Sequence, residues 1–144
     1  EAVNSRNRAE VEHLEVFADQ SGFIESVTQC LQEADKLELW RPVGIYDLGM
    51  LIGFAMYGYF PEPAPGQVWL DRLLIDRRFQ GRGYGRAALA ALLERLEREY
   101  HKKRIYLSVV EANRPAAALY ESFGFRFTGE RDTHGERVMC LRTR

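Results

Sequence analysis

Apolar residues recur with a helical period in three stretches of the chain. The first two lie near the N-terminus, and Ser21 stands between them at the position of a helix-capping residue. The third runs from Tyr84 to Tyr100 and carries Glu94 and Arg98 as an i, i+4 pair on its polar face. The positions that define these helices are Val11, Leu14, Phe17 and Ala18, then Ile24, Val27, Thr28 and Leu31, and finally Leu89, Leu92, Leu93, Leu96 and Tyr100.

Strand-like patterns occupy much of the remaining chain. Residues 42–46 and 50–59, separated by a turn at 47–49, predict a β-hairpin. Further elements are strands at residues 68–75, 104–110, 125–129 and 137–141, a short helix between Asn113 and Gly124, and a final turn at His134 and Gly135. The order ααβββαβαββ predicts a single mixed α/β domain, of the α+β type, over residues 1–144. In it, the strand before the long helix and the strand after it run parallel.

Two charged residues, Asp71 and Arg72, interrupt the apolar run of residues 68–75. Such an interruption fits a β-bulge, or a strand whose polar residues face a site. The simpler alternative for Asp71 is a surface carboxylate that pairs with Arg72 or another neighbour. Asp71 is therefore either a candidate site residue or a member of a surface ion pair.

The overall composition is that of one ordinary domain. The chain has 144 residues, of which 46% are hydrophobic and 28% charged, as in soluble globular proteins. No apolar run reaches the roughly 20 residues of a membrane helix and no signal-peptide pattern is present, so we expect a cytoplasmic protein without a membrane partner. Cys30 and Cys140 lie far apart and the histidines lack metal-ligand spacing, so no metal site is expected.

The net charge of −1 conceals two halves of opposite sign. Residues 1–71 hold 12 acidic and 4 basic residues, whereas residues 72–144 hold 9 acidic and 16 basic residues. Chance variation over solvated faces is one interpretation. The other is that the first half meets a cation and the second half an anion. A nucleic-acid partner is not expected, because the basic residues concentrate around one glycine-rich loop and at the C-terminus instead of forming a continuous stripe.

That loop, between the strand at 68–75 and the long helix, is rich in glycine and arginine. Gly81, Gly83 and Gly85 expose backbone N–H groups at a helix N-terminus, where the helix dipole favours an anion. A tight strand-to-helix turn is the simpler interpretation, but the flanking arginines favour a phosphate cradle. The loop lacks the Gly-Lys-Ser/Thr of a P-loop, and it lies too late in the chain for a dinucleotide fold. The arginines concerned are Arg77, Arg78, Arg82 and Arg86.

Two motifs follow one another in this region. Residues 80–85 read Gln-x-x-Gly-x-Gly after an apolar strand, and residues 111–125 read Glu-x-Asn-x-x-Ala-x-x-x-Tyr-x-x-x-Gly-Phe. Their order and spacing, with the predicted elements, resemble the GNAT superfamily of N-acetyltransferases over essentially the whole chain. The resemblance implies a central, mostly antiparallel sheet, flanked by helices, in which one parallel strand pair splays around acetyl-CoA. It also implies a homodimer.

The resemblance further implies which residues hold acetyl-CoA, the co-substrate. Pantetheine would bond to the backbone at residues 73–75, and the pyrophosphate to the amides of residues 81–86. Tyr120 would stand near the thioester sulfur, unless it is simply an aromatic residue of the core. The implied cofactor-binding residues are Leu73, Leu74, Ile75, Gln80, Gly81, Arg82, Gly83, Tyr84, Gly85, Arg86 and Asn113.

Acetyl transfer to an amine makes two chemical demands. An alkyl amine with a pKa near 10.4 is less than about 0.1% free base at neutral pH, so a carboxylate must take its proton. Asp71 is the first candidate, because its strand leads to the cofactor loop, and Glu111 is the second. The leaving thiolate, with a parent pKa of about 8.5, needs a proton donor, and Tyr120 fits that role. No nucleophile for a covalent intermediate stands out, so we expect direct attack in a ternary complex.

Segments 53–57, 69–72 and 23–26 look most similar, within the superfamily, to the bacterial spermine/spermidine acetyltransferases. A polyamine needs spaced carboxylates and aromatic walls. The candidate substrate-binding residues are Glu25, Glu33, Tyr57, Glu62, Trp69 and Asp71, with Asp35 and Tyr59 as further members of the set. The leading hypothesis is thus a polyamine N-acetyltransferase. The alternatives are acetylation of another small amine or of a protein N-terminus, and a non-catalytic acyl-CoA-binding module.

Overall fold

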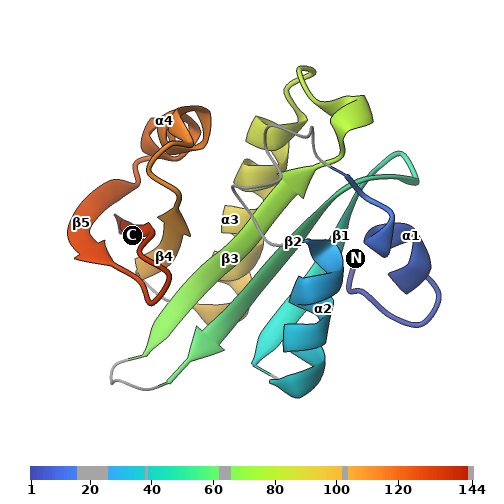
Figure 1. Ribbon diagram of the computed structural model, residues 1–144, viewed down its shortest axis with the longest axis horizontal. Coiled ribbons are helices and arrows are strands. Elements are labelled where there is room, and N and C mark those ends of the chain that lie inside the picture. The colour runs from blue at the N-terminus through green and yellow to red at the C-terminus, as the bar shows by residue number, and fades with distance from the viewer. Residues whose placement is uncertain (16–25, 38, 62–65, 102–103, 143–144) are drawn as a thin grey trace.

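The computed structural model describes residues 1–15, 26–37, 39–61, 66–101 and 104–142. Its helices and strands follow one another in the predicted order (Figure 1). Their bounds are α1 Arg8–Glu12, α2 Val27–Lys36, β1 Trp40–Asp47, β2 Met50–Phe60, β3 Gln67–Ile75, the 3-10 turn η2 Arg77–Phe79, α3 Tyr84–Tyr100, β4 Arg104–Val109, α4 Arg114–Ser122, β5 Arg126–Arg131 and β6 Arg137–Arg142. None of the helices described is long and apolar enough to cross a membrane.

Within the described ranges, six strands form one mixed sheet in the order β1-β2-β3-β4-β6-β5. Neighbouring strands are antiparallel except β3 and β4, which pair in parallel at Val68 with Ile105 and at Trp69 with Tyr106. Past these rungs the two strands separate towards their carboxyl ends, and Figure 1 shows β4 and α4 leaning away from β3. The predicted mixed sheet with one splayed parallel pair is confirmed.

Helices cover both faces of the sheet. Along β2, Ala55 and Tyr57 point to the face covered by α3, whereas Phe54 and Met56 point to the face covered by α1 and α2. Side chains alternate between the faces of a strand, so this central strand is apolar at every one of these positions. The apolar stripe of α3 is buried as its helical period predicts, and its buried members are Ala88, Leu89, Leu92 and Leu96.

The N-cap of α2 is Ser26, and the expectation that Ser21 caps this helix was wrong. The hydroxyl of Ser26 accepts a hydrogen bond from the backbone N–H of Gln29, while the Gln29 side chain accepts one from the N–H of Ser26. This reciprocal capping box satisfies two N–H groups that a helix start otherwise leaves unbonded. It fixes the first helical residue at Val27.

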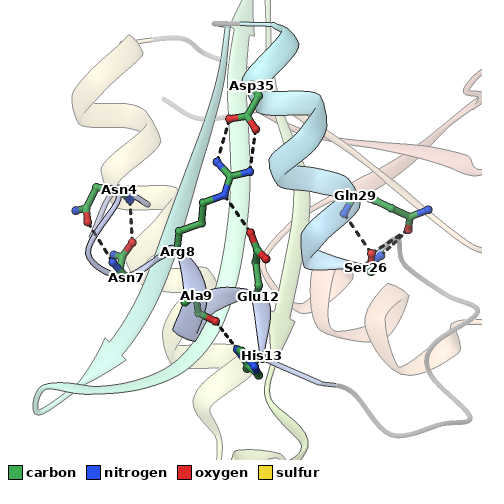
Figure 2. A network of polar contacts seen from close by, with 9 residues as sticks. All are labelled: Asn4, Asn7, Arg8, Ala9, Glu12, His13, Ser26, Gln29 and Asp35. Atoms are coloured by element: carbon green, nitrogen blue, oxygen red, sulfur yellow. Dashed lines mark hydrogen bonds and ion pairs between the residues drawn. The ribbon is translucent and has the colours of Figure 1, made fainter.

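A charged side chain ties α1 to α2. α1 ends at Glu12, and the expected continuation through Phe17 and Ala18 lies outside the described residues. The Arg8 guanidinium donates to Glu12 at 3.0 Å and to both carboxylate oxygens of Asp35 at 3.0 and 2.8 Å (Figure 2). Asp35 is therefore neutralised by Arg8, which holds the pKa of that carboxyl below its ordinary value.

β3 contains the predicted bulge. Arg72 pairs with Met56 and Leu70 pairs with Tyr57, so Asp71 is the extra residue of β3 in the register. In a regular strand, Asp71 and Arg72 would point to opposite faces. The bulge instead brings both side chains to the same cavity, described below.

Candidate active site

The loop between β3 and α3 presents backbone amides at a helix N-terminus. Gly81 and Gly83 have φ angles of +79° and +83°, a left-handed conformation that glycine adopts without strain. Gly83 is the N-cap of α3 and makes no side-chain cap. Gln80 donates to the carbonyl oxygen of Ile75 at 2.9 Å and so closes the loop. The first-turn N–H groups of α3 are thus available to an anion.

The four arginines of this loop divide into two pairs. Arg77 and Arg78 form ion pairs with carboxylates at 3.4 and 2.8 Å. Arg82 and Arg86 lie over aromatic rings, 5.8 and 5.4 Å from the ring centroids, as Arg78 also does, but within the part of the chain described here they pair with no carboxylate. The charges that remain uncompensated next to the amides of residues 81–86 are therefore those of Arg82 and Arg86.

The opening between β3 and β4 brings most of the predicted cofactor-binding residues together. Past Trp69, no strand in the described ranges pairs with the β4 side of β3, so the peptide groups of residues 73–75 border the opening. Asn113 begins α4 on the other side as its N-cap. The Tyr84 side chain points elsewhere, because its hydroxyl donates to Asp47 in the β1–β2 turn at 2.8 Å.

Tyr120 lies on α4, half-buried and packed against Phe125 with ring centroids 5.8 Å apart. Burial raises the pKa of Tyr120 to about 12, against the opposing effect of the positive charge of Arg72. The phenol therefore stays protonated at neutral pH and can donate a proton or a hydrogen bond. The positive charge of Arg72 lowers the pKa of Tyr120 and also that of Glu136, which lines the cavity described next. The phenol and that cavity are therefore both near the Arg72 guanidinium.

A cavity of about 360 Å³ lies beside the parallel strand pair. Among the residues that the structure describes, four carboxylates line it: Glu33 from α2, Asp71 from β3, and Asp132 and Glu136 from the β5–β6 turn. Three aromatic rings of the described residues complete its wall, and they are Trp40, Phe60 and Trp69. The cavity therefore combines negative charge with π-faces, and both attract cations.

The β5–β6 turn holds its carboxylates in a fixed arrangement. Asp132 accepts the backbone N–H groups of His134 and Glu136, both at 2.9 Å. Burial and the negative charge of Asp132 raise the pKa of Glu136 above its ordinary value, and Arg72 opposes them. Asp71 raises it further, which indicates that the carboxylates of β3 and of the turn act on one another across the cavity.

Asp71 is both an ion-pair partner and a cavity residue. One Arg72 nitrogen lies 3.4 Å from the Asp71 carboxylate and donates to the Asp71 carbonyl oxygen at 2.7 Å. The plain alternative considered from the sequence, pairing with Arg72, is therefore present. It coexists with the exposure of Asp71 to the cavity.

The structure places two predicted aromatic contacts away from this cavity. Tyr57 is 1% exposed on the face covered by α3, where its hydroxyl donates to Glu99 at 3.0 Å. Tyr59 stacks on Tyr100 of α3, with centroids 5.9 Å apart. Trp69 belongs to the cavity, whereas Tyr57 belongs to the core. Because the face of the sheet that each residue reaches depends on register, the sequence did not separate them.

The second candidate base, Glu111, also lies outside the cavity. It is exposed, and its carboxylate forms an ion pair with Arg131 at 3.4 Å. Among the described residues that line the cavity, the carboxylate on the strand leading to the loop is Asp71. Two further predicted acceptor residues, Glu25 and Glu62, lie outside the described residues.

Sequence reasoning missed two carboxylates and two rings of the cavity. Asp132 and Glu136 belong to the basic half of the chain and were not considered, and neither were Trp40 and Phe60. For Asp132 and Glu136, the only signal in the sequence was the turn predicted at His134. A predicted turn does not indicate which part of the fold it lies against. The sheet order places β6 beside β4, and so brings this turn towards β3.

An anion cradle and an acidic, aromatic cavity thus flank one open strand edge. This combination suits the binding of an anionic ligand beside a cationic one. The profile of the acetyltransferase (GNAT) family matches residues 8–125, and the chain belongs to this family. Over 142 residues it is 49% identical to the spermine/spermidine N(1)-acetyltransferase of Bacillus subtilis (strain 168), with 96% of this chain and 93% of that protein covered. It is 48% identical, with the same coverage, to a probable spermine N(1)-acetyltransferase of Bacillus subtilis subsp. natto (strain BEST195).

Solved structures of low sequence identity share the fold. The aminoglycoside acetyltransferase AAC(6')-Ib in complex with coenzyme A superimposes with a TM-score of 0.81 at 20% identity, covering 99% of this chain and 92% of that one. The spermidine N-acetyltransferase of Vibrio cholerae in complex with CoA and spermine gives a TM-score of 0.73 at 18% identity, with 98% and 91% covered. At these identities the likeness concerns the fold.

Proposed function

We propose that this protein transfers an acetyl group from acetyl-CoA to a primary amine of a polyamine, spermidine or spermine. The observation that carries the proposal is the cavity beside the open strand edge, whose described carboxylates come from α2, β3 and the β5–β6 turn. A polyamine presents several ammonium groups along one flexible chain, so carboxylates on separate elements can each meet one of them. The names of the two Bacillus relatives, 49% and 48% identical, support the same acceptor.

The donor side of the proposal rests on the cradle and the strand edge. The amides of residues 81–86, with Arg82 and Arg86, bind the phosphates of acetyl-CoA, as expected at a helix N-terminus flanked by guanidiniums. The backbone of residues 73–75 and Asn113 hold the pantetheine arm. When bound, acetyl-CoA supplies a thioester carbonyl that a neutral amine attacks.

Asp71 is the proposed general base. It lies on the strand that borders the opening and it lines the acceptor cavity, so one carboxylate faces both substrates. Glu111 is exposed and paired with Arg131, which leaves it poorly placed for this role. Asp71 takes the ammonium proton, and the freed nitrogen lone pair forms the new N–C bond. Glu33, Asp132 and Glu136 hold the remaining charges of the acceptor.

Tyr120 is the proposed acid. With a pKa raised to about 12 by burial, its phenol keeps its proton at neutral pH. As the C–S bond breaks, the phenol donates its proton to the thiolate sulfur, and the proton that the acetylated nitrogen then loses restores the phenol. Base and acid therefore belong to β3 and α4, on opposite sides of the opening. The cytoplasmic location and the homodimer expected from the sequence remain predictions.

A substrate panel tests the proposal. The enzyme is incubated with acetyl-CoA and, separately, with spermidine, spermine, a monoamine, an aminoglycoside and a peptide with a free N-terminus. Thiol release and mass spectrometry then report turnover and product. We expect acetylated spermidine and spermine. Turnover restricted to the peptide or the aminoglycoside would reject the acceptor and keep the acetyl transfer. Binding of CoA without turnover on any amine would indicate a binding module.

A variant pair adds a test of the cavity itself. Glu33→Gln removes one cavity charge from an exposed helix position, and Glu94→Gln, on the polar face of α3, is the matched control. We expect Glu33→Gln to raise the KM for spermidine by more than the KM for a monoamine, because a monoamine has no second ammonium to lose a partner. Equal KM changes for the two amines would contradict this role.

A further inference from the structure

A second cavity, of about 470 Å³, lies on the C-terminal strands β4, β5 and β6. Among the described residues, three arginines line it, and the strand register explains why. Arg104 is paired directly with Arg142, and Arg126 is paired with Cys140, two residues before Arg142 on β6. Directly paired residues share a face of the sheet, and so do residues two apart on one strand. The pairing therefore gathers the three guanidiniums on one face.

Within the described residues, no printed ion pair neutralises the three guanidiniums of this group. Arg104 and Arg142 have no carboxylate partner within the ranges that the structure describes. Arg126 donates to the backbone carbonyls of Glu121 and Phe125 at 3.2 and 2.9 Å, which orients its guanidinium without neutralising it. Directly opposed like charges destabilise an antiparallel pair, so the arrangement opposes folding unless an anion binds there.

This cavity is separate from the proposed CoA site. Ile105 pairs with Val68, so Arg104 lies at the level of the first residue of β3, whereas the glycine-rich loop follows Ile75 at the other end of that strand. At about 3.3 Å per residue, the two sites are roughly 25 Å apart along the sheet. They also differ in construction, because the loop uses backbone amides and this cavity uses side chains.

We propose that the arginine cavity, defined by Arg104, Arg126 and Arg142, binds the phosphate group of a small ligand. Glu130 is the single carboxylate among the described residues that line it, so three positive charges and one negative charge leave a balance of +2. A phosphate monoester or inorganic phosphate carries a charge of about −1.5 to −2 at neutral pH and matches that balance. Guanidinium groups also offer the paired N–H donors that phosphate oxygens accept.

Calorimetric titration of the CoA-saturated enzyme tests this site, because bound CoA occupies the other phosphate cradle. The probes are inorganic phosphate and glycerol 3-phosphate at low ionic strength. The variants are the double substitution Arg104→Gln with Arg142→Gln, the single substitution Arg126→Gln, and Arg98→Gln on the polar face of α3 as control. We expect binding to the wild-type protein and the control, and a loss of about tenfold or more in each cavity variant. The stronger of the two probes distinguishes a free phosphate from a monoester.

Thermal unfolding provides a second readout. Phosphate should raise the Tm of the wild-type protein and the Arg98 control and leave that of the double variant unchanged. The unliganded double variant should melt no earlier than the wild type, since a like-charge pair has been removed. Absence of phosphate binding to CoA-saturated wild-type enzyme, or equal affinity in the double variant, would overturn the proposal. Polyamine acetylation would stand in either case.

Discussion

Trp69 stacks on Tyr106, with ring centroids 5.4 Å apart and planes inclined by 25°, at the last rung where β3 and β4 pair. Past this rung the strands separate, so the stacked rings mark the base of the opening. Trp69 also lines the acidic cavity, and Tyr106 lines the arginine cavity. The stack thus divides two surfaces of opposite charge, and a polyamine that extends past Trp69 would meet guanidiniums instead of carboxylates.

Replacing Asp71 by Asn tests the proposed base. The amide keeps the size of the side chain and cannot take the ammonium proton, so kcat should fall by about 100-fold or more. Glu111→Gln is the matched control, because this exposed carboxylate pairs with Arg131, and its kcat should change by less than about threefold. Initial rates at saturating acetyl-CoA and spermidine measure both. Similar losses in the two variants would show that Asp71 has no special role.

Tyr120→Phe separates catalysis from binding. It removes the hydroxyl and keeps the ring that packs on Phe125, so the fold and the CoA affinity should be preserved while kcat falls by about tenfold or more. Because burial raises the pKa of Tyr120 to about 12, its ionisation should add no decline in rate at mildly alkaline pH. Steady-state kinetics and CoA titration check these points. Equal losses in turnover and CoA binding would favour a binding module.

Glu136→Gln should change stability and substrate affinity in opposite directions. The folded state raises the pKa of Glu136, so it binds more protons than the unfolded state between the unfolded pKa, about 4.3, and the higher folded value. Ionisation of Glu136 therefore lowers the free energy of unfolding as the pH rises through that window. Removing it should raise the free energy of unfolding at neutral pH, with the gain disappearing below pH of about 4.

Denaturant unfolding at neutral pH and at pH of about 4 measures the gain in free energy of unfolding in Glu136→Gln. The KM for spermidine should rise in the same variant because one cavity charge is lost. Thr128 lies on the same hairpin but does not line the acidic cavity, so Thr128→Val serves as the comparison for general effects on this hairpin. A Glu136→Gln protein that is less stable at neutral pH would contradict the assigned environment of this carboxyl.

Two glycine substitutions distinguish backbone strain from contact with the donor. Gly83→Ala forces a methyl-bearing residue into φ of +83° and should cost about 1–2 kcal/mol, with weaker CoA binding. Gly85→Ala lies inside α3, where the nearest described side-chain atom to an added Cβ is a Leu119 carbon at 3.9 Å. This substitution should therefore raise the free energy of unfolding by about 0.5–1 kcal/mol. Its methyl group should nevertheless crowd a pyrophosphate on these amides. Unchanged CoA affinity in Gly85→Ala would place the phosphates elsewhere.

Local elements followed from local sequence. The helical period predicted α3 at Tyr84–Tyr100, as observed, and the charged interruption at Asp71 marked the bulge in β3. The N-cap of α2 was misplaced because two serines precede this helix. Only Ser26 has Gln three residues later, and that spacing completes a capping box. Sequence patterns within a single helix or strand were therefore sufficient to predict where these elements lie.

The charge pattern of the sequence indicated two surfaces of opposite charge but did not indicate which residues form each surface. Of the cavity carboxylates among the described residues, Glu33 and Asp71 come from the acidic half, whereas Asp132 and Glu136 come from the basic half. The arginines of the basic half are likewise spread, with one group at the glycine-rich loop and another at the cavity of Arg104 and Arg142. Opposite surfaces exist, but each of them draws on segments far apart in the chain.

The sequence by itself determined most of the elements, the family motifs and the glycine-rich loop, because these depend on neighbours within a few residues. Only the tertiary structure decided which side chains meet. Strand register buried Tyr57 and turned Trp69 to the cavity, and the order β3-β4-β6 brought the turn at Asp132 towards Asp71. The antiparallel pairing of β4 with β6 also placed Arg104 directly opposite Arg142. Such contacts depend on strand pairing between distant segments, and a shift of one residue reverses the face of every side chain.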